Sequence, residues 1–203
     1  NLVQCRPLQT RGLGKNIEIP KLDSKEECLF YSEGNFMGGN LRIPVDKIIF
    51  VDIHEYLEMP EQEKYQVARY IGKLNQILKN QNVLLMGPGR WGTTTPSLGV
   101  PVHFTEISHM AAICEISYQD EGLMPELSYG SHFFQDLVES GVFYIALFKE
   151  QKNVVFHEEM LKKENLLANY ISEAEDYKKC IQVLDTKGME LYSDISCQRV
   201  FCR

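Results

Sequence analysis

The sequence predicts an α/β fold: a mixed, largely parallel sheet with helices on both faces, forming a single domain plus an N-terminal leftover strand. Two observations lead to this class. Apolar runs alternate with amphipathic stretches between residues 29 and 148, the order expected of strand–helix–strand crossovers. The run from Lys47 to Asp52 contains four consecutive apolar residues, which is typical of a strand covered on both faces.

Each element follows from local pattern. Strands are expected over residues 29–32, 47–52, 83–86, 111–118 and 142–148. The clearest helix begins after Pro60, where Glu61 and Glu63 suit the positive end of the helix dipole. Its apolar positions repeat at spacings of four, three and four residues, so they form one buried stripe: Val67, Ile71, Leu74 and Leu78.

The second half of the chain is expected to contain three further helices. The first covers 131–139, with Ser131 as its N-cap and Gly141 as its end. The other two are expected over 158–171 and 173–184, and residues 189–201 are expected to add short edge strands.

The first 20 residues are expected to be distinct from the rest. Residues 1–7 fit a short strand ended by Pro7, and residues 11–21 contain Gly12, Gly14 and Pro20, as a linker would. No methionine opens the chain. We therefore interpret residues 1–20 as the end of a truncated domain with its linker, and residues 21–203 as a C-terminal α/β domain.

Composition excludes several classes of partner. The formal net charge is −7 and no basic stripe offsets it, which argues against nucleic acid and anionic membranes. Uncharged stretches such as 142–148 are far shorter than the ~20 apolar residues of a membrane span. The six cysteines are scattered, and neither they nor the histidines show metal-site spacing. We expect a cytoplasmic protein with reduced thiols and no metal site.

A glycine-rich hexapeptide, Gly87-Pro-Gly-Arg-Trp-Gly92, directly follows the expected strand 83–86. It matches the dinucleotide-binding fingerprint formally, but two prolines and a glycine within 93–101 exclude the helix that such a site needs. It also lacks the Gly-Lys-Ser/Thr end of a phosphate-binding Walker loop. The remaining hypothesis is a small anionic ligand held by loop amides and side chains of Gly87, Gly89, Arg90, Trp91, Gly92, Thr93 and Thr94.

A structural turn explains the same loop equally well, with Arg90 paired to an acid and Trp91 capping the core. Ser131 and His132 form a second candidate, because His132 lies in the first turn of a helix, where the dipole favours a neutral imidazole. The alternative for His132 is that its ring nitrogens hydrogen-bond only to solvent or to the backbone. If the neighbouring strands are parallel, both candidates emerge at the carboxyl edge of the sheet, where open α/β sheets bind ligands.

Three stretches resemble a known family. Leu-Val-Gln-Cys-Arg-Pro-Leu resembles the closing strand of the ATP-grasp nucleotide domain in phosphoenolpyruvate synthases and pyruvate phosphate dikinases, in which Gln4 and Arg6 match positions that contact nucleotide phosphates. Leu-Met-Gly-Pro-Gly-Arg-Trp-Gly-Thr-Thr-Thr-Pro-Ser-Leu-Gly-Val-Pro-Val and Gly-Ser-His-Phe-Phe-Gln-Asp-Leu resemble the region after that domain in a bacterial branch of these proteins. The resemblance covers most of residues 29–148.

The resemblance implies a parent protein that is an ATP- and Mg-dependent phosphotransferase. The swivelling domain with its Thr-Ser-His-x-Ala motif and the phosphoenolpyruvate-binding barrel are absent from this chain, so that reaction is not assigned to it. No cofactor is expected here, and catalytic residues are not assigned. The expected function is an accessory domain that binds a small phosphorylated or carboxylate ligand beside the parent's nucleotide-binding domain. Two alternatives stay open: a non-catalytic docking or homodimerisation module, and a stand-alone phosphotransferase or hydrolase built on Arg90 and His132.

Overall fold

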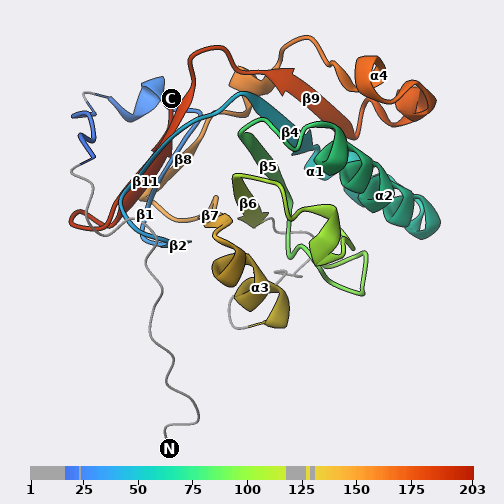
Figure 1. Ribbon diagram of the computed structural model, residues 1–203, viewed down its shortest axis with the longest axis horizontal. Coiled ribbons are helices and arrows are strands. Elements are labelled where there is room, and N and C mark those ends of the chain that lie inside the picture. Colours follow the sequence, from blue (N-terminus) through green and yellow to red (C-terminus); the bar gives the residue numbers. More distant parts are fainter. Residues whose placement is uncertain (1–16, 23, 118–126, 129–130) are drawn as a thin grey trace, which may run out of the picture.

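Two β-sheets and a few helices make up the computed structural model, which describes residues 17–22, 24–117, 127–128 and 131–203 (Figure 1). Sheet A has five strands in the order β3-β10-β11-β1-β8, and sheet B has six in the order β2-β7-β6-β5-β4-β9. Neighbouring strands of sheet A are all antiparallel, whereas sheet B is mixed. Residues 1–16, with the expected leftover strand, lie outside the described part of the chain.

The strands of sheet A are β1 (Phe30–Glu33), β3 (Leu41–Pro44), β8 (Val154–Phe156), β10 (Glu190–Asp194) and β11 (Arg199–Cys202). Those of sheet B are β2 (Phe36–Met37), β4 (Lys47–Val51), β5 (Val83–Pro88), β6 (Ala112–Ser117), β7 (Phe143–Phe148) and β9 (Ile181–Asp185). The α-helices are α1 (Ile53–Glu58), α2 (Glu61–Ile77), α3 (His132–Ser140) and α4 (Leu167–Tyr170). Short 3-10 helices cover Lys25–Glu27, Phe104–Glu106, Glu158–Leu161 and Ser172–Tyr177.

The inner strands of sheet B explain where the helices lie. Strands β4, β5, β6 and β7 are parallel and lie side by side in chain order. Parallel crossovers are almost always right-handed, so crossovers that all step in one direction place their connecting segments on one face of the sheet. The buried residues of α2 and α3 accordingly belong to the same core as one face of sheet B.

Sheet A covers the opposite face of sheet B (Figure 1). Successive side chains of β4 alternate between the two cores: Ile49 and Val51 face the helices, whereas Ile48 and Phe50 face sheet A. The apolar run 47–52 therefore does belong to a strand covered on both faces. The expected single, largely parallel sheet with helices on both faces is wrong, because the second cover is an antiparallel sheet.

Two predicted helices form, α2 with the predicted start and α3 with both predicted ends. In α2, Pro60 is the N-cap and Val67, Ile71 and Leu74 are buried. In α3, the Ser131 hydroxyl accepts the Phe134 N–H at 3.2 Å, and Gly141 ends the helix with a φ of +75°. Among the described residues, none of the helices is long and apolar enough to cross a membrane.

The prediction of helices over 158–171 and 173–184 is wrong. The first stretch holds a 3-10 turn and the four-residue α4, and the second ends in β9. Ile181 and Leu184 fit a helical spacing, but pairing of β9 with β4 directs them to opposite cores. Strands β10 and β11 lie inside sheet A, not at its edge as predicted, since β3 and β1 flank them.

The outer edge of β9 is closed by one side chain. Asn165 accepts N–H bonds from Val183 at 2.9 Å and Leu167 at 3.0 Å, and its amide donates to the Ile181 and Lys178 carbonyls at 2.9 Å each. The Leu166 N–H adds a bond to the Val183 carbonyl at 2.8 Å. An edge strand that would otherwise present unpaired backbone groups is thereby satisfied within the chain.

Replacing Asn165 with Ala should lower the free energy of unfolding by about 1–3 kcal/mol, because partly buried backbone groups lose their partners. Asn169→Ala, at an exposed position of α4, is the control and should change it by less than about 0.5 kcal/mol. Urea unfolding followed by circular dichroism measures both values. Equal effects of the two substitutions would show that the edge does not depend on Asn165.

Candidate functional site

The loop that follows β5 is built by backbone hydrogen bonding. Gly89 forms a bridge with Gly99, and the four consecutive N–H groups of residues 89–92 donate to Ile116 O at 2.9 Å, Leu98 O at 2.9 Å, Glu115 Oε1 at 3.0 Å and Val100 O at 3.1 Å. Every amide in this stretch is therefore occupied by a protein acceptor. These groups are not available as a cradle for a phosphate, and side chains would have to bind any anion here.

Two glycines of the motif are required by close packing. A Cβ on Gly87 would lie 2.8 Å from Cζ2 of Trp91. At Gly92, φ is +71°, and a Cβ would lie 2.3 Å from Cδ2 of Phe133 in the first turn of α3. Glycine is thus the residue that lets the loop, the indole and α3 approach one another.

The indole of Trp91 is fully buried in the core between sheet B and the helices. Its Nε1 has no acceptor among the described residues. With no exposed face, this ring does not offer a stacking surface to a ligand from solvent. Its position corresponds to the alternative in which Trp91 caps the core.

The guanidinium of Arg90 is half-buried and lacks a carboxylate partner among the described residues. Three arginines there have a buried Nε without an acceptor: Arg69, Arg90 and Arg199. Arg69 is paired with Glu106 at 2.6 Å and Arg199 with Asp194 at 3.3 Å, so their charges are compensated. Arg90 has no such ion pair in the described part of the chain, which distinguishes it from the other two.

The threonines that follow are arranged mainly by local contacts. The Thr93 hydroxyl accepts the Thr95 N–H at 3.1 Å, a turn internal to the loop. Thr94 is exposed, and its carbonyl accepts the Tyr65 hydroxyl of α2 at 3.3 Å. Their side chains therefore lie at the surface of the loop, close in sequence to Arg90.

The start of α3 lies against this loop, as the predicted parallel strands require. The contact of Gly92 with Phe133 joins the two, and the Ser128 hydroxyl lies 3.2 Å from the Trp91 carbonyl. Ser131 serves as the N-cap and donates its own hydroxyl to Ser128 O at 2.7 Å. His132 is exposed, and no hydrogen bond joins it to Arg90 among the described residues. Gln4 and Arg6 lie outside the described residues.

The topology of sheet B bears on what this edge can bind. In doubly wound sheets the ligand crevice opens where the strand order reverses, because neighbouring crossovers go to opposite faces. The order β4-β5-β6-β7 runs one way without such a reversal. In the described part of the chain, the strand order near Arg90 therefore does not open a crevice of this kind.

Glu115 is the residue at this edge that the sequence analysis missed. Its side chain on β6 is fully buried. Oε1 accepts the Trp91 N–H at 3.0 Å and the Ser128 hydroxyl, while Oε2 accepts the Ser128 N–H at 2.7 Å and the Tyr144 hydroxyl at 2.6 Å. One carboxyl group thus joins β6, β7, the loop after β5 and the segment before α3. An acidic residue within the apolar run Ala-Ile-Cys-Glu-Ile was the available sequence signal.

Burial raises the pKa of the Glu115 carboxyl above its ordinary value. The hydrogen bonds from the side chains of Ser128 and Tyr144, and from the Ser128 and Trp91 amides, lower the pKa and partly offset the burial. A carboxyl group in this position is costly to ionise, and its donors are what make the ionised form tolerable.

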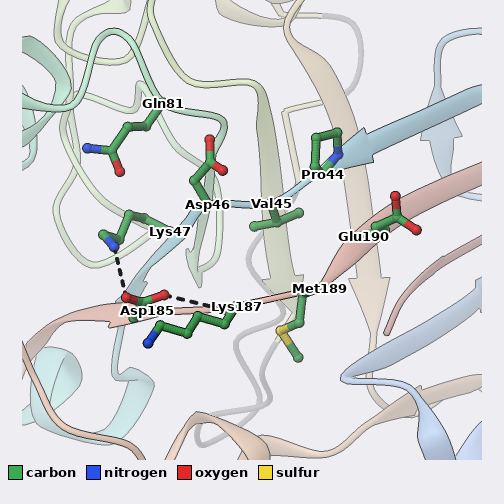
Figure 2. A pocket seen from close by; sticks show the side chains of 10 residues that line it. Pro44, Val45, Asp46, Lys47, Gln81, Asp185, Lys187, Met189 and Glu190 are labelled. Atoms are coloured by element: carbon green, nitrogen blue, oxygen red, sulfur yellow. Dashed lines mark hydrogen bonds and ion pairs between the residues drawn. The ribbon is translucent and has the colours of Figure 1, made fainter.

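Arg90 does not line either of two hollows found elsewhere among the described residues. A pocket of about 560 Å³ lies at the amino ends of β4 and β5, lined by residues of both sheets (Figure 2). Arg90 follows the carboxyl end of β5, so it lies at the other end of that strand. On the wall of the pocket Lys47 Nζ lies 3.3 Å from Asp185 Oδ2, so these charges satisfy each other (Figure 2). The second, of about 760 Å³, runs beside α2 and contains the ion pairs Arg69–Glu106 and Lys73–Glu173.

Among the described residues, no group of three or more His, Cys, Asp or Glu side chains is arranged to hold a metal ion. Comparisons of the chain with protein-family models, curated proteins and solved structures find no match. The likeness to phosphoenolpyruvate synthases therefore rests on the sequence stretches themselves.

Replacing Gly92 with Ala should destabilise the fold strongly, because it adds a clash with the Phe133 ring to an unfavourable φ of +71°. Gly34→Ala is a matched control, since Gly34 has a φ of +75° with nothing within 4 Å of the added Cβ. The control should cost about 1–2 kcal/mol, the price of a left-handed backbone alone. Gly92→Ala should cost about 1–3 kcal/mol more in denaturant unfolding. Similar losses in both variants would refute the packing role of Gly92.

The pH dependence of stability should reveal Glu115. Its pKa is raised in the native state, so the native protein binds more protons than the unfolded chain between the unfolded value, near 4.5, and the native value. The free energy of unfolding should then fall as the pH rises through this interval. Glu115→Gln removes this contribution. The free energy of unfolding of the wild type, relative to that of the variant, should therefore fall as the pH rises. Urea titrations at several pH values test this, and a difference that is constant with pH would contradict it.

Proposed function

We propose that this chain is a non-catalytic binding domain that takes a small phosphorylated or carboxylate ligand at Arg90. The observation that carries the proposal is the half-buried guanidinium, whose Nε lacks an acceptor and whose charge lacks a carboxylate partner among the described residues. Buried donors in native proteins are nearly always paired, and guanidinium groups suit planar or tetrahedral oxyanions. A bound anion would satisfy both the donor and the charge.

The surroundings of Arg90 support this choice. Its backbone is fixed by the N–H bond to Leu98 O at 2.9 Å, so the side chain projects from a rigid loop. The adjacent first turn of α3 carries His132, and the positive end of a helix dipole attracts anions. The hydroxyl of the exposed Thr94 is a further donor on the same loop, whereas the Thr93 hydroxyl donates to the Thr95 carbonyl at 3.4 Å.

We further propose that the domain is an accessory part of a phosphoenolpyruvate synthase-like protein, next to a nucleotide-binding domain. The support is the resemblance of residues 2–8, 85–102 and 130–137 to that family. It makes inorganic phosphate, phosphoenolpyruvate and adenine nucleotides the first ligands to test.

No observation among the described residues favours docking or dimerisation instead. The large apolar side chains that are most exposed are Tyr65, Ile77 and Ile195. Tyr65 and Ile77 lie twelve positions apart on α2, about 18 Å along the helix, and Ile195 lies beyond β10. These side chains form no continuous apolar face.

Substitution of Arg90 by Gln should weaken anion binding at least about tenfold, because a charge-assisted hydrogen bond is lost. Phosphate, phosphoenolpyruvate and ATP are titrated into the full chain and followed by calorimetry and amide chemical shifts. Arg42→Gln is the control, since Arg42 is exposed on sheet A and paired with Glu190, and it should bind as the wild type does. Absence of binding by the wild type, or equal binding by Arg90→Gln, would refute the proposal.

A further inference from the structure

The Glu115 carboxyl joins the two parts of the proposed site without facing solvent itself. It lies on the helix-facing side of β6 and is fully buried, whereas its strand neighbour Cys114 faces sheet A. Among the described residues, the titratable group in contact with it is Tyr144, and Trp91 and Ser128 supply neutral donors. A buried carboxyl with this many donors contributes little net stability, because desolvation offsets its bonds.

The contacts of Glu115 lead in two directions. Through the Trp91 N–H at 3.0 Å it holds the peptide unit that joins Arg90 to Trp91. On the other side, the N–H and the hydroxyl of Ser128 both donate to the Glu115 carboxyl. The Ser128 carbonyl in turn accepts the Ser131 hydroxyl at 2.7 Å, and Ser131 caps α3 beside His132. One side chain therefore sets the position of the Arg90 loop relative to the start of α3.

We infer that Glu115 is the positioning residue of the anion site, and this inference rests on the proposed function. It does not touch the ligand. It holds Arg90 and the first turn of α3 at a fixed separation, so that an anion meets both without a rearrangement of the loop. Groups that orient a binding side chain from behind commonly change affinity by one to two orders of magnitude when they are replaced.

The test uses sulfate, whose charge is constant near neutral pH, titrated into the full chain and followed by amide and arginine Nε–H chemical shifts. Glu115→Gln keeps the size of the side chain, but its NH2 group replaces one acceptor, and sulfate affinity should fall about tenfold. Tyr144→Phe removes a single donor from the same carboxyl and should lower affinity by a smaller factor. Glu106→Gln, at the partner of Arg69, should leave affinity unchanged.

A spectroscopic signature separates positioning from a general loss of stability. In the wild type, sulfate should shift the amides of Trp91 and Ser128 although neither contacts it, because Glu115 couples them to Arg90. In folded Glu115→Gln this response should disappear while the Arg90 resonance still shifts. If Glu115→Gln does not fold, the smaller affinity loss and weakened amide response in Tyr144→Phe decide the question.

The outcomes distinguish the two proposals. Absence of Arg90-dependent sulfate binding in the wild type overturns both the anion site and the role of Glu115 in it. Arg90-dependent binding that is unchanged in Glu115→Gln and Tyr144→Phe overturns the positioning role alone. Reduced affinity in both variants, with Glu106→Gln at the wild-type value, supports it.

Discussion

The carboxyl group of Glu115 is the contact on which the carboxyl edge of sheet B depends. It is buried at the centre of the parallel strands and accepts hydrogen bonds from Trp91, Ser128 and Tyr144. These donors come from three segments that are far apart in sequence, and the buried Trp91 N–H would lose its acceptor without this carboxyl. Burial raises the pKa of this carboxyl, which means that its ionised form is destabilised by the loss of solvent at the position where it joins those segments.

The order of the parallel strands has an equally wide effect. Because β4, β5, β6 and β7 follow one another in one direction, right-handed crossovers place α2 and α3 on the same face of sheet B. Both ends of the described chain supply the cover of the opposite face, since β1 and β3 pair with β11 and β10. The same one-way order removes the strand reversal that opens a ligand crevice in doubly wound sheets, so the anion binding that we propose at this edge depends on side chains such as Arg90.

The glycine motif shows how a familiar pattern can serve another purpose. Gly87 and Gly92 admit the Trp91 indole and the Phe133 ring, and the amides of residues 89–92 are occupied by protein acceptors. The backbone of the loop therefore has a structural role, and in the proposed anion site the guanidinium of Arg90 is the group that faces the ligand. The sequence pattern alone could not distinguish a phosphate-binding loop from a structural turn. The acceptors of the loop amides include Leu98, Val100 and Glu115, and only the folded chain brings these acceptors to the amides.

Local sequence determined the α/β class, the start of α2, both ends of α3, and the inner strands of sheet B. Capping residues, a helical stripe and apolar runs act over a few neighbouring residues, so they can be recognised without the fold. Tertiary structure decided the second sheet, the strand β9 where a helix was predicted, and the partners of Glu115. These features depend on pairing between residues far apart in the chain, such as Ile49 with Val183, for which a single sequence carries no register.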